Sequence, residues 1–320
     1  MKRTARRLCI LAALACAAPA AAQEAWPQKN VRLVVAFAPA GPADIVARLL
    51  GQSLQDKWGK PVVVENRAGA GGNAGAAAVA RAEPDGYSIL VTTSAFVVNL
   101  SLYDKPGYAL ADFKAAVYAA TTPNIVVSSP TLRASTLPEI IAAAKTANLS
   151  YASAGVGTTT QLAGELIFKI LAGVDIRHVP FTGAAPAANA LVAGQVPLAM
   201  LTVSSAGPFI KSGAMKAVAV TTTRRVAELP DTPTVTETGV GEVEAATDIF
   251  FFMPARTPDD IVAKFNADAR ALLGSDALAA AFKAAGVAPV LVDSAAANAY
   301  VAREVEKWGD VIRRAGVKLD

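Results

Sequence analysis

The sequence predicts an α/β fold made of two lobes. Between residues 31 and 92, short runs rich in β-branched residues alternate with stretches of helical periodicity, in the order βαβαβ. A second α/β series begins near residue 124. Loops of small and hydroxyl-bearing residues follow several of the predicted strands, at the edge where such sheets bind ligands.

The first series is predicted from its periodicity. Ile45, Leu49, Leu54 and Trp58 recur at helical spacing. The order of elements implies a mostly parallel sheet with helices on both faces. The predicted strands are 31–37, 61–65 and 88–92, and the predicted helices are 44–58 and 74–82.

The second series and the C-terminal region complete the two lobes. Pro258 suits the first turn of a helix, because a backbone N–H there has no intrahelical acceptor and proline therefore loses no hydrogen bond. The predicted strands are 124–128, 150–153, 176–179, 196–201 and 217–221, and the helices are 137–147, 160–172, 184–193, 258–273, 276–285 and 295–315. We expect residues 23–122 and 246–320 to form the first lobe and 123–245 the second, so that the last helices return to the first lobe.

The N-terminus has the features of a secretory signal peptide. Four basic residues between Lys2 and Arg7 precede a short apolar run that ends in small residues. The apolar run is about 11 residues, too short to span a bilayer. We expect cleavage after Ala22. A cut before Cys16 with lipid attachment fits less well, because Ala13-Leu14-Ala15 lacks the usual leading leucine.

Removal of residues 1–22 changes the composition of the chain. The full chain has 30 basic and 26 acidic residues, and the peptide takes four basic residues and both cysteines with it. The mature chain is therefore close to neutral and cannot form disulfides. We expect a soluble, exported monomer that binds no nucleic acid.

Two loops are the main candidates for ligand binding. The first runs from Ala38 to Asp44, where Asp44 is placed to cap the following helix. The second runs from Ser153 to Thr160 and ends at a helix start, where free N–H groups favour an anion. Further candidates follow two other strands, at 92–96 and 202–205. Each loop has the alternative explanation that its hydroxyls serve only as caps.

The sequence offers little support for an enzyme. His178 is the only histidine, and no Gly-x-Ser-x-Gly motif accompanies it. One histidine and no mature cysteine argue against a zinc site. Residues 67–75 resemble a dinucleotide-binding loop, but no acidic residue follows about 20 positions on, so close packing of a small-residue helix is the favoured interpretation. We expect no catalytic residue, no metal and no cofactor.

Ordered motifs along the whole mature chain resemble the Bug (TctC-like) family of tripartite tricarboxylate transporter receptors. The matching segments are Trp26-Pro27, 31–48, 59–72, Pro84-Asp85-Gly86-Tyr87, 151–157, 162–166, 178–183 and 229–234. The resemblance implies a type II periplasmic binding protein with its ligand cleft between the lobes. It also implies a carboxylate ligand, such as a dicarboxylate, amino acid or aromatic acid, and membrane transporter subunits as partners.

The resemblance also implies how the ligand is held. Family members hold one carboxylate through backbone N–H groups, hydroxyls and ordered waters. Carried onto this chain, Ala40 and Gly41 would grip the carboxylate from one lobe and the 153–160 loop from the other, while Asp44 orders the first loop. The remaining candidates are Phe37, Thr92, Ser94, Ser153, Gly157, Thr158, Thr159, Thr160, Phe181, Ala185 and Thr202. Phe37, Phe96 and Phe181 either contact an apolar ligand body or pack in the core.

Three positions depart from the family pattern. Ala40 replaces a frequent glycine, Pro197 a frequent aspartate, and Asp248 begins the segment where a Trp-x-Gly motif is usual. We expect Asp248 to alter a cleft wall or a hinge-facing surface. Two other functions stay open at this point. One is a ligand-sensing partner of a membrane kinase, and the other is a periplasmic hydrolase or isomerase that uses His178.

Overall fold

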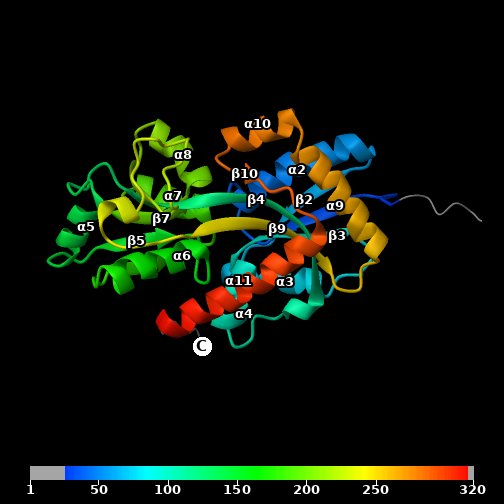
Figure 1. Cartoon of the computed structure of the whole chain (residues 1–320), viewed down its shortest axis with the longest axis horizontal. Coiled ribbons are helices and arrows are strands. Elements are labelled where there is room, and N and C mark those ends of the chain that lie inside the picture. Colours follow the sequence, from blue (N-terminus) through cyan, green and yellow to red (C-terminus); the bar gives the residue numbers. More distant parts are fainter. Residues whose placement is uncertain (1–25, 316–320) are drawn as a thin grey trace, which may run out of the picture.

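The computed structural model describes residues 26–315, which form two α/β lobes joined by two strands (Figure 1). The predicted signal peptide lies outside these residues. The first lobe contains β1 (Val31–Val35), α2 (Pro42–Trp58), β2 (Val62–Asn66), η1 (Ala70–Gly72), α3 (Asn73–Ala80), β3 (Ser88–Thr93), α4 (Ala95–Leu102) and η2 (Leu110–Asp112). The second contains α5 (Leu137–Ala144), β5 (Ser150–Ser153), α6 (Thr159–Gly164), η3 (Glu165–Leu171), β6 (Arg177–Pro180), α7 (Ala184–Val192), β7 (Leu198–Thr202), α8 (Val203–Lys211), β8 (Lys216–Val220) and η4 (Thr236–Thr238).

The strands of the first lobe follow the order β2-β1-β3-β9-β4. β1 is parallel to β2 and β3, as predicted, but β9 (Ala246–Pro254) is antiparallel to β3. The expectation of a mostly parallel sheet is therefore wrong for the first-lobe part of the sheet, where β9 is antiparallel to both of its neighbours, β3 and β4. β9 was not predicted as a strand, because eight of its nine residues are buried and give no alternation of polar and apolar positions.

Two neighbouring strands run from one lobe to the other. β4 (Phe113–Ser128) has 16 residues, of which the sequence predicted only the last five. It pairs with β9 as far as Pro123 and with β7 and β8 from Asn124 onward. We propose this crossing as the boundary between the lobes, at 122/123 and 245/246.

The second lobe has parallel pairing of β7, β5 and β6, as the βαβ order predicts. Ala187, Ala188 and Leu191 on one face of α7 are buried against β7 and β5 in a core cluster of this lobe. α6 continues into η3 without a break, so the two together match the predicted helix at 160–172. α8 was not predicted, because Gly207 and Pro208 lie within it.

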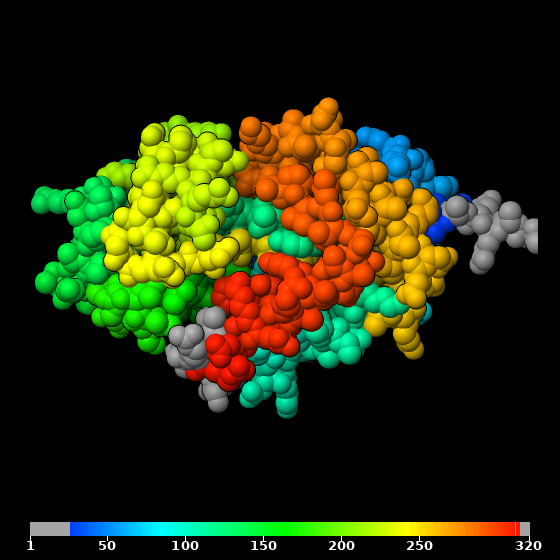
Figure 2. Space-filling view, in the orientation of Figure 1, coloured from blue at the N-terminus to red at the C-terminus, as the bar shows by residue number. Residues whose placement is uncertain are grey.

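The C-terminal helices pack on elements of the proposed first lobe. They are α9 (Asp259–Leu273), α10 (Asp276–Ala284) and α11 (Ser294–Ala315), with the short β10 (Ala288–Pro289) between the last two. Pro258 precedes α9 as its N-cap and does not lie in its first turn. α11 packs on α4 and β4 and also touches η3 of the second lobe. Figure 2 shows this segment, in orange and red, covering the first lobe up to the edge of the second. None of the helices in residues 26–315 is both long and apolar enough to cross a membrane.

Candidate functional site

An inner cavity lies between the lobes where several helices begin. It encloses about 380 Å³, including its open side. The first lobe contributes Phe37, Thr93 and the start of α2 at Gly41, Pro42 and Ala43. The remaining lining residues are Ala154, Thr158, Thr159, Thr160, Ala184, Thr202 and Thr247. The two predicted loops therefore meet at one cavity, from opposite lobes.

The first loop is held in shape by the Asp44 carboxylate. Asp44 accepts hydrogen bonds from the Ala40 N–H (2.9 Å), from Asn66 Nδ2 (2.8 Å) and from the Arg48 guanidinium (2.9 Å to each oxygen). Ala40 has a φ of +62°, a left-handed conformation that a non-glycine residue adopts only when its surroundings fix it. Asn66 also donates to the Phe37 carbonyl (3.0 Å). This network joins both ends of the loop to α2.

Asp44 orders the loop, but it is not the N-cap of α2. The N-cap is Gly41, and Asp44 lies in the first turn, three residues further on. Burial raises the pKa of Asp44, but the hydrogen bonds from Arg48, the Ala40 N–H and Asn66 outweigh it and hold the pKa below its usual value. The carboxylate is therefore charged at neutral pH, and no side chain covers the first N–H groups of α2.

The second loop is built from hydroxyls that bond to its own backbone. Thr158 is the N-cap of α6 and accepts from the Gln161 N–H (3.3 Å), while its hydroxyl donates to the Gly155 carbonyl (2.6 Å). Gln161 in turn accepts from the Gly157 N–H (2.7 Å). Capping thus uses part of the loop's polar groups, as the alternative explanation proposed. Thr158, Thr159 and Thr160 nevertheless all line the cavity.

A chain of buried polar groups joins this loop to both crossing strands. The hydroxyls of Thr159 and Thr247 lie 2.7 Å apart, and Thr247 donates to Asn124 Oδ1 at 2.7 Å. Asn124 belongs to β4 and Thr247 to β9. The floor of the cavity is therefore continuous with the strands between the lobes.

Four helices begin at residues that line the inner cavity. Gly41–Ala43, Thr158–Thr160, Ala184 and Thr202 mark the starts of α2, α6, α7 and α8. A helix N-terminus presents unpaired N–H groups and the positive end of the helix dipole. α2 and α7 have no side-chain cap. Among the described residues that line this cavity, none carries a charge. The arrangement suits a small anion held by backbone groups and hydroxyls.

Not every predicted residue lies in this cavity. Thr92 and Ser94 are buried and line neither interlobe pocket, and Ser94 bonds to Asp248 (3.2 Å). Phe96 stacks on Phe252 in the first-lobe core, as its core-packing alternative proposed. Ala185 is the neighbour of a lining residue and does not line the cavity itself. A ligand contact by these residues stays a prediction.

Sequence reasoning missed two lining residues, Ala184 and Thr247, whereas Thr93 lies in the candidate segment 92–96. Ala184 begins α7 and lies one position from the predicted residue Ala185. Strand and helix ends cannot be located from sequence to a single residue. Thr247 gave no signal, because β9 itself was not predicted.

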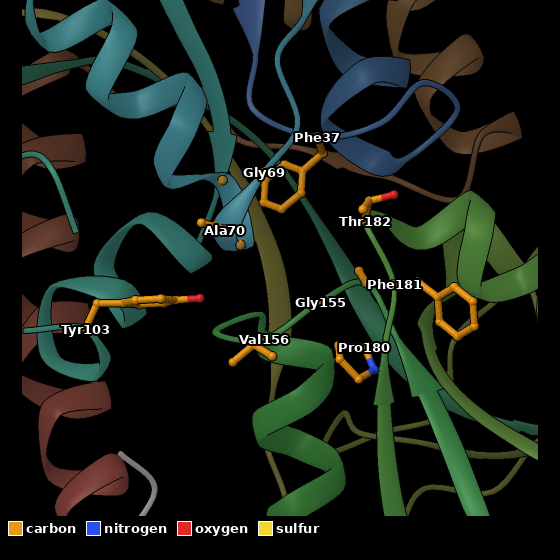
Figure 3. A pocket seen from close by; sticks show the side chains of 12 residues that line it. Phe37, Gly69, Ala70, Tyr103, Gly155, Val156, Pro180, Phe181 and Thr182 are labelled. Atoms are coloured by element: carbon orange, nitrogen blue, oxygen red, sulfur yellow. The ribbon is translucent and has the colours of Figure 1, made fainter. Parts of the chain in front are cut away.

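An outer pocket of about 570 Å³, including its mouth, adjoins the inner cavity. Phe37 and Ala154 line both. The outer pocket is bounded by Gly69–Gly72 and Tyr103 on one side and by Ala154–Val156 and Pro180–Thr182 on the other (Figure 3). Figure 3 shows the Phe181 ring turned away from the pocket, and the ring packs against the second-lobe core.

The glycine-rich segment before α3 has two roles in this arrangement. A Cβ on Gly75 would lie 2.8 Å from Ala36 Cα, so the glycine allows α3 to pack closely on the end of β1, as the sequence predicted. A Cβ on Gly71 would lie 2.3 Å from the Val156 carbonyl oxygen of the other lobe. Gly183 likewise faces Ala38 across the cleft. The two lobes therefore touch at glycines on both sides of the cavity.

His178 lies outside both interlobe pockets. Its Nε2 is 2.7 Å from the Ser153 hydroxyl, and its ring packs 5.0 Å from that of Tyr151. Ser153 is fully buried, so its hydroxyl cannot reach a substrate. Burial lowers the pKa of His178 to about 4, so the ring is neutral at neutral pH. The pair lies behind the second loop, and neither residue lines an interlobe pocket. Within residues 26–315, no group of three or more His, Cys, Asp or Glu residues is placed to hold a metal ion.

Comparisons with known proteins match this geometry. The model of the family described as "Tripartite tricarboxylate transporter family receptor" matches residues 46–317. Protein BugT of Bordetella pertussis is 32% identical over 308 residues, which cover 95% of this chain and 94% of BugT.

Solved structures support the same relationship. The periplasmic binding protein BugD has a TM-score of 0.87 and 34% identity, and the match covers 92% of this chain and 99% of BugD. R. palustris Rpa4515, solved with adipate, has a TM-score of 0.88 and 32% identity, and the match covers 91% of this chain and 99% of that protein. The predicted two-lobed fold of a periplasmic binding protein is confirmed.

Proposed function

We propose that this chain, which belongs to the tripartite tricarboxylate transporter receptor family, captures one small carboxylate in the inner cavity. It then presents the carboxylate to the membrane subunits of such a transporter. The observation that carries the proposal is the convergence of four helix N-termini on a cavity lined by no charged residue. Each N-terminus stabilises an anion without placing a counter-ion in the site. The adipate bound by Rpa4515 is an anion of this kind.

The mechanism is capture by closure of the two lobes. The first loop approaches the ligand from one lobe, and the starts of α6 and α7 approach it from the other. Closure excludes water, and a hydrogen bond is stronger in the drier cleft than in solvent. The chain acts in the periplasm as a monomer and catalyses no reaction, because the only Ser–His pair in residues 26–315 has a buried serine outside the cleft.

A thermal-shift and calorimetry screen of the mature chain tests this proposal. The panel contains aliphatic monocarboxylates, dicarboxylates including adipate, aromatic acids, and the uncharged amide of each. A ligand that binds only the folded state raises the melting temperature by mass action. We expect acids but not amides to do so. Absence of a shift with every acid, or equal binding of acids and amides, would reject the proposal.

A further inference from the structure

The outer pocket differs in chemistry from the inner cavity. Its walls are aromatic rings, aliphatic side chains and glycine backbone, and none of the described residues that line it is charged. Tyr103 and Thr182 provide its side-chain hydroxyls, and neither hydroxyl forms a hydrogen bond with another described residue. Figure 3 shows the Tyr103 hydroxyl directed into the space below Ala70. Burial raises the pKa of Tyr103, so this hydroxyl is neutral and can donate or accept a hydrogen bond.

The two pockets are adjacent, because Phe37 and Ala154 line both. An elongated molecule with its carboxylate at the helix N-termini would extend past these two residues toward the outer pocket. α3 begins at the outer pocket, where its N-cap Gly72 is a lining residue, but the N–H groups of Asn73 and Ala74 in its first turn already donate to the carbonyls of Ala70 and Gly69. The electrostatic support for an anion is therefore concentrated at the inner cavity.

We propose that the outer pocket makes this receptor selective for monocarboxylates with an apolar or neutral polar body, against dicarboxylates of the same length. This inference rests on the proposed function, since it assumes that one carboxylate occupies the inner cavity. A second carboxylate in the outer pocket would lose water without gaining a cation or the free N–H groups of a helix start. An apolar end there gains contact with Phe37, Val156 and Pro180.

Calorimetry with matched acids tests the selectivity. Pentanoate is compared with glutarate, and hexanoate with adipate, at pH 7.5, where both carboxyl groups are ionised. We expect each monocarboxylate to bind at least about tenfold more tightly, because a second carboxylate loses solvation in the outer pocket that solvent at the mouth restores only in part. Dicarboxylates that bind equally or more tightly would overturn the selectivity and leave the proposed function standing. Failure of every acid to bind would overturn both.

A charge introduced at the rim gives a second measurement. Thr182 is exposed, and Thr182→Arg should raise the affinity for adipate relative to hexanoate by about tenfold, since the guanidinium can pair with the outer carboxylate. Val192→Arg is the matched control, because it adds the same charge at an exposed position that lines neither pocket. An unchanged ratio in Thr182→Arg, or the same change in both variants, would contradict the placement of the outer end of the ligand.

Discussion

Closure of the two lobes depends on the absence of a side chain at Gly71. Gly71→Ala would place a Cβ 2.3 Å from the Val156 carbonyl oxygen, whereas ordinary contact begins near 3.4 Å. The lobes would have to part by about 1 Å at this point, which stretches hydrogen bonds of ordinary length beyond their range. Loss of one charge-assisted hydrogen bond from ligand to protein, about 1.5–3 kcal/mol, weakens binding roughly tenfold to a hundredfold.

Gly173→Ala separates this clash from backbone strain. Gly71 and Gly173 both have a φ of +63°, but a Cβ on Gly173 would meet nothing within 4 Å. Both variants should lose about 1–2 kcal/mol of stability to the left-handed conformation. Only Gly71→Ala should lose affinity, since the strain is present before and after closure. Calorimetry with a carboxylate from the screen measures the affinities, and urea unfolding the stabilities. Equal affinity of the two variants would refute the closure argument.

Three further predictions concern the loops. Asp44→Asn should weaken binding about tenfold, because Oδ2 accepts from the Ala40 N–H and Arg48 while Oδ1 accepts from Arg48 and Asn66, so the NH2 group of an amide would replace one of these acceptors and face two donors; affinity equal to wild type would show that the loop holds its shape without the carboxylate. His178→Asn should leave affinity within about twofold. The variant should also lose less stability than the wild type as the pH falls from about 6.5 toward 4, because in this range the unfolded wild-type chain binds a proton at His178 that the folded chain excludes. Urea titrations across this range check it, and a slope of stability against pH equal to that of the wild type would contradict it. Thr159→Val should reduce affinity about fivefold by removing a cavity hydroxyl, and Thr159→Ser should restore it; equal affinities of the valine and serine variants would exclude a role for the hydroxyl.

Local patterns were sufficient to predict the parts of the fold that end at the cavity. The helix at α2 was visible from the spacing of Ile45, Leu49 and Leu54, and the loop before it from its small residues. Both predicted loops lie at one cavity, because each follows the carboxyl end of a strand in its own lobe, β1 or β5, and the two lobes face each other there. What the sequence could not supply was the side-chain direction at single positions, such as Phe181, whose ring packs into the second lobe.

Long-range pairing was the larger omission. β9 lies between β3 and β4 although about 150 residues separate it from β3 along the chain, and nothing local to Phe250 or Phe251 indicates that partner. The first half of β4 is almost wholly buried and so lacks the alternation by which a strand is recognised. Since β4 and β9 both cross between the lobes, the same omission hid Thr247 from the predicted site.

Asp248 shows how the fold reassigns a position that the sequence marked as unusual. We expected it to alter a cleft wall or a hinge-facing surface, but it lines neither interlobe pocket and is buried in the first lobe. Its carboxylate accepts hydrogen bonds from Tyr118 (2.7 Å), Tyr300 (2.9 Å) and Ser94 (3.2 Å). Tyr300 belongs to α11, so the carboxylate ties the C-terminal helix to β9 one residue beyond Thr247 of the cavity floor. Replacement of Asp248 by an apolar residue would leave these three hydroxyls without their acceptor. This departure from the family pattern therefore concerns the attachment of α11 to the crossing strand and not the shape of the ligand cleft.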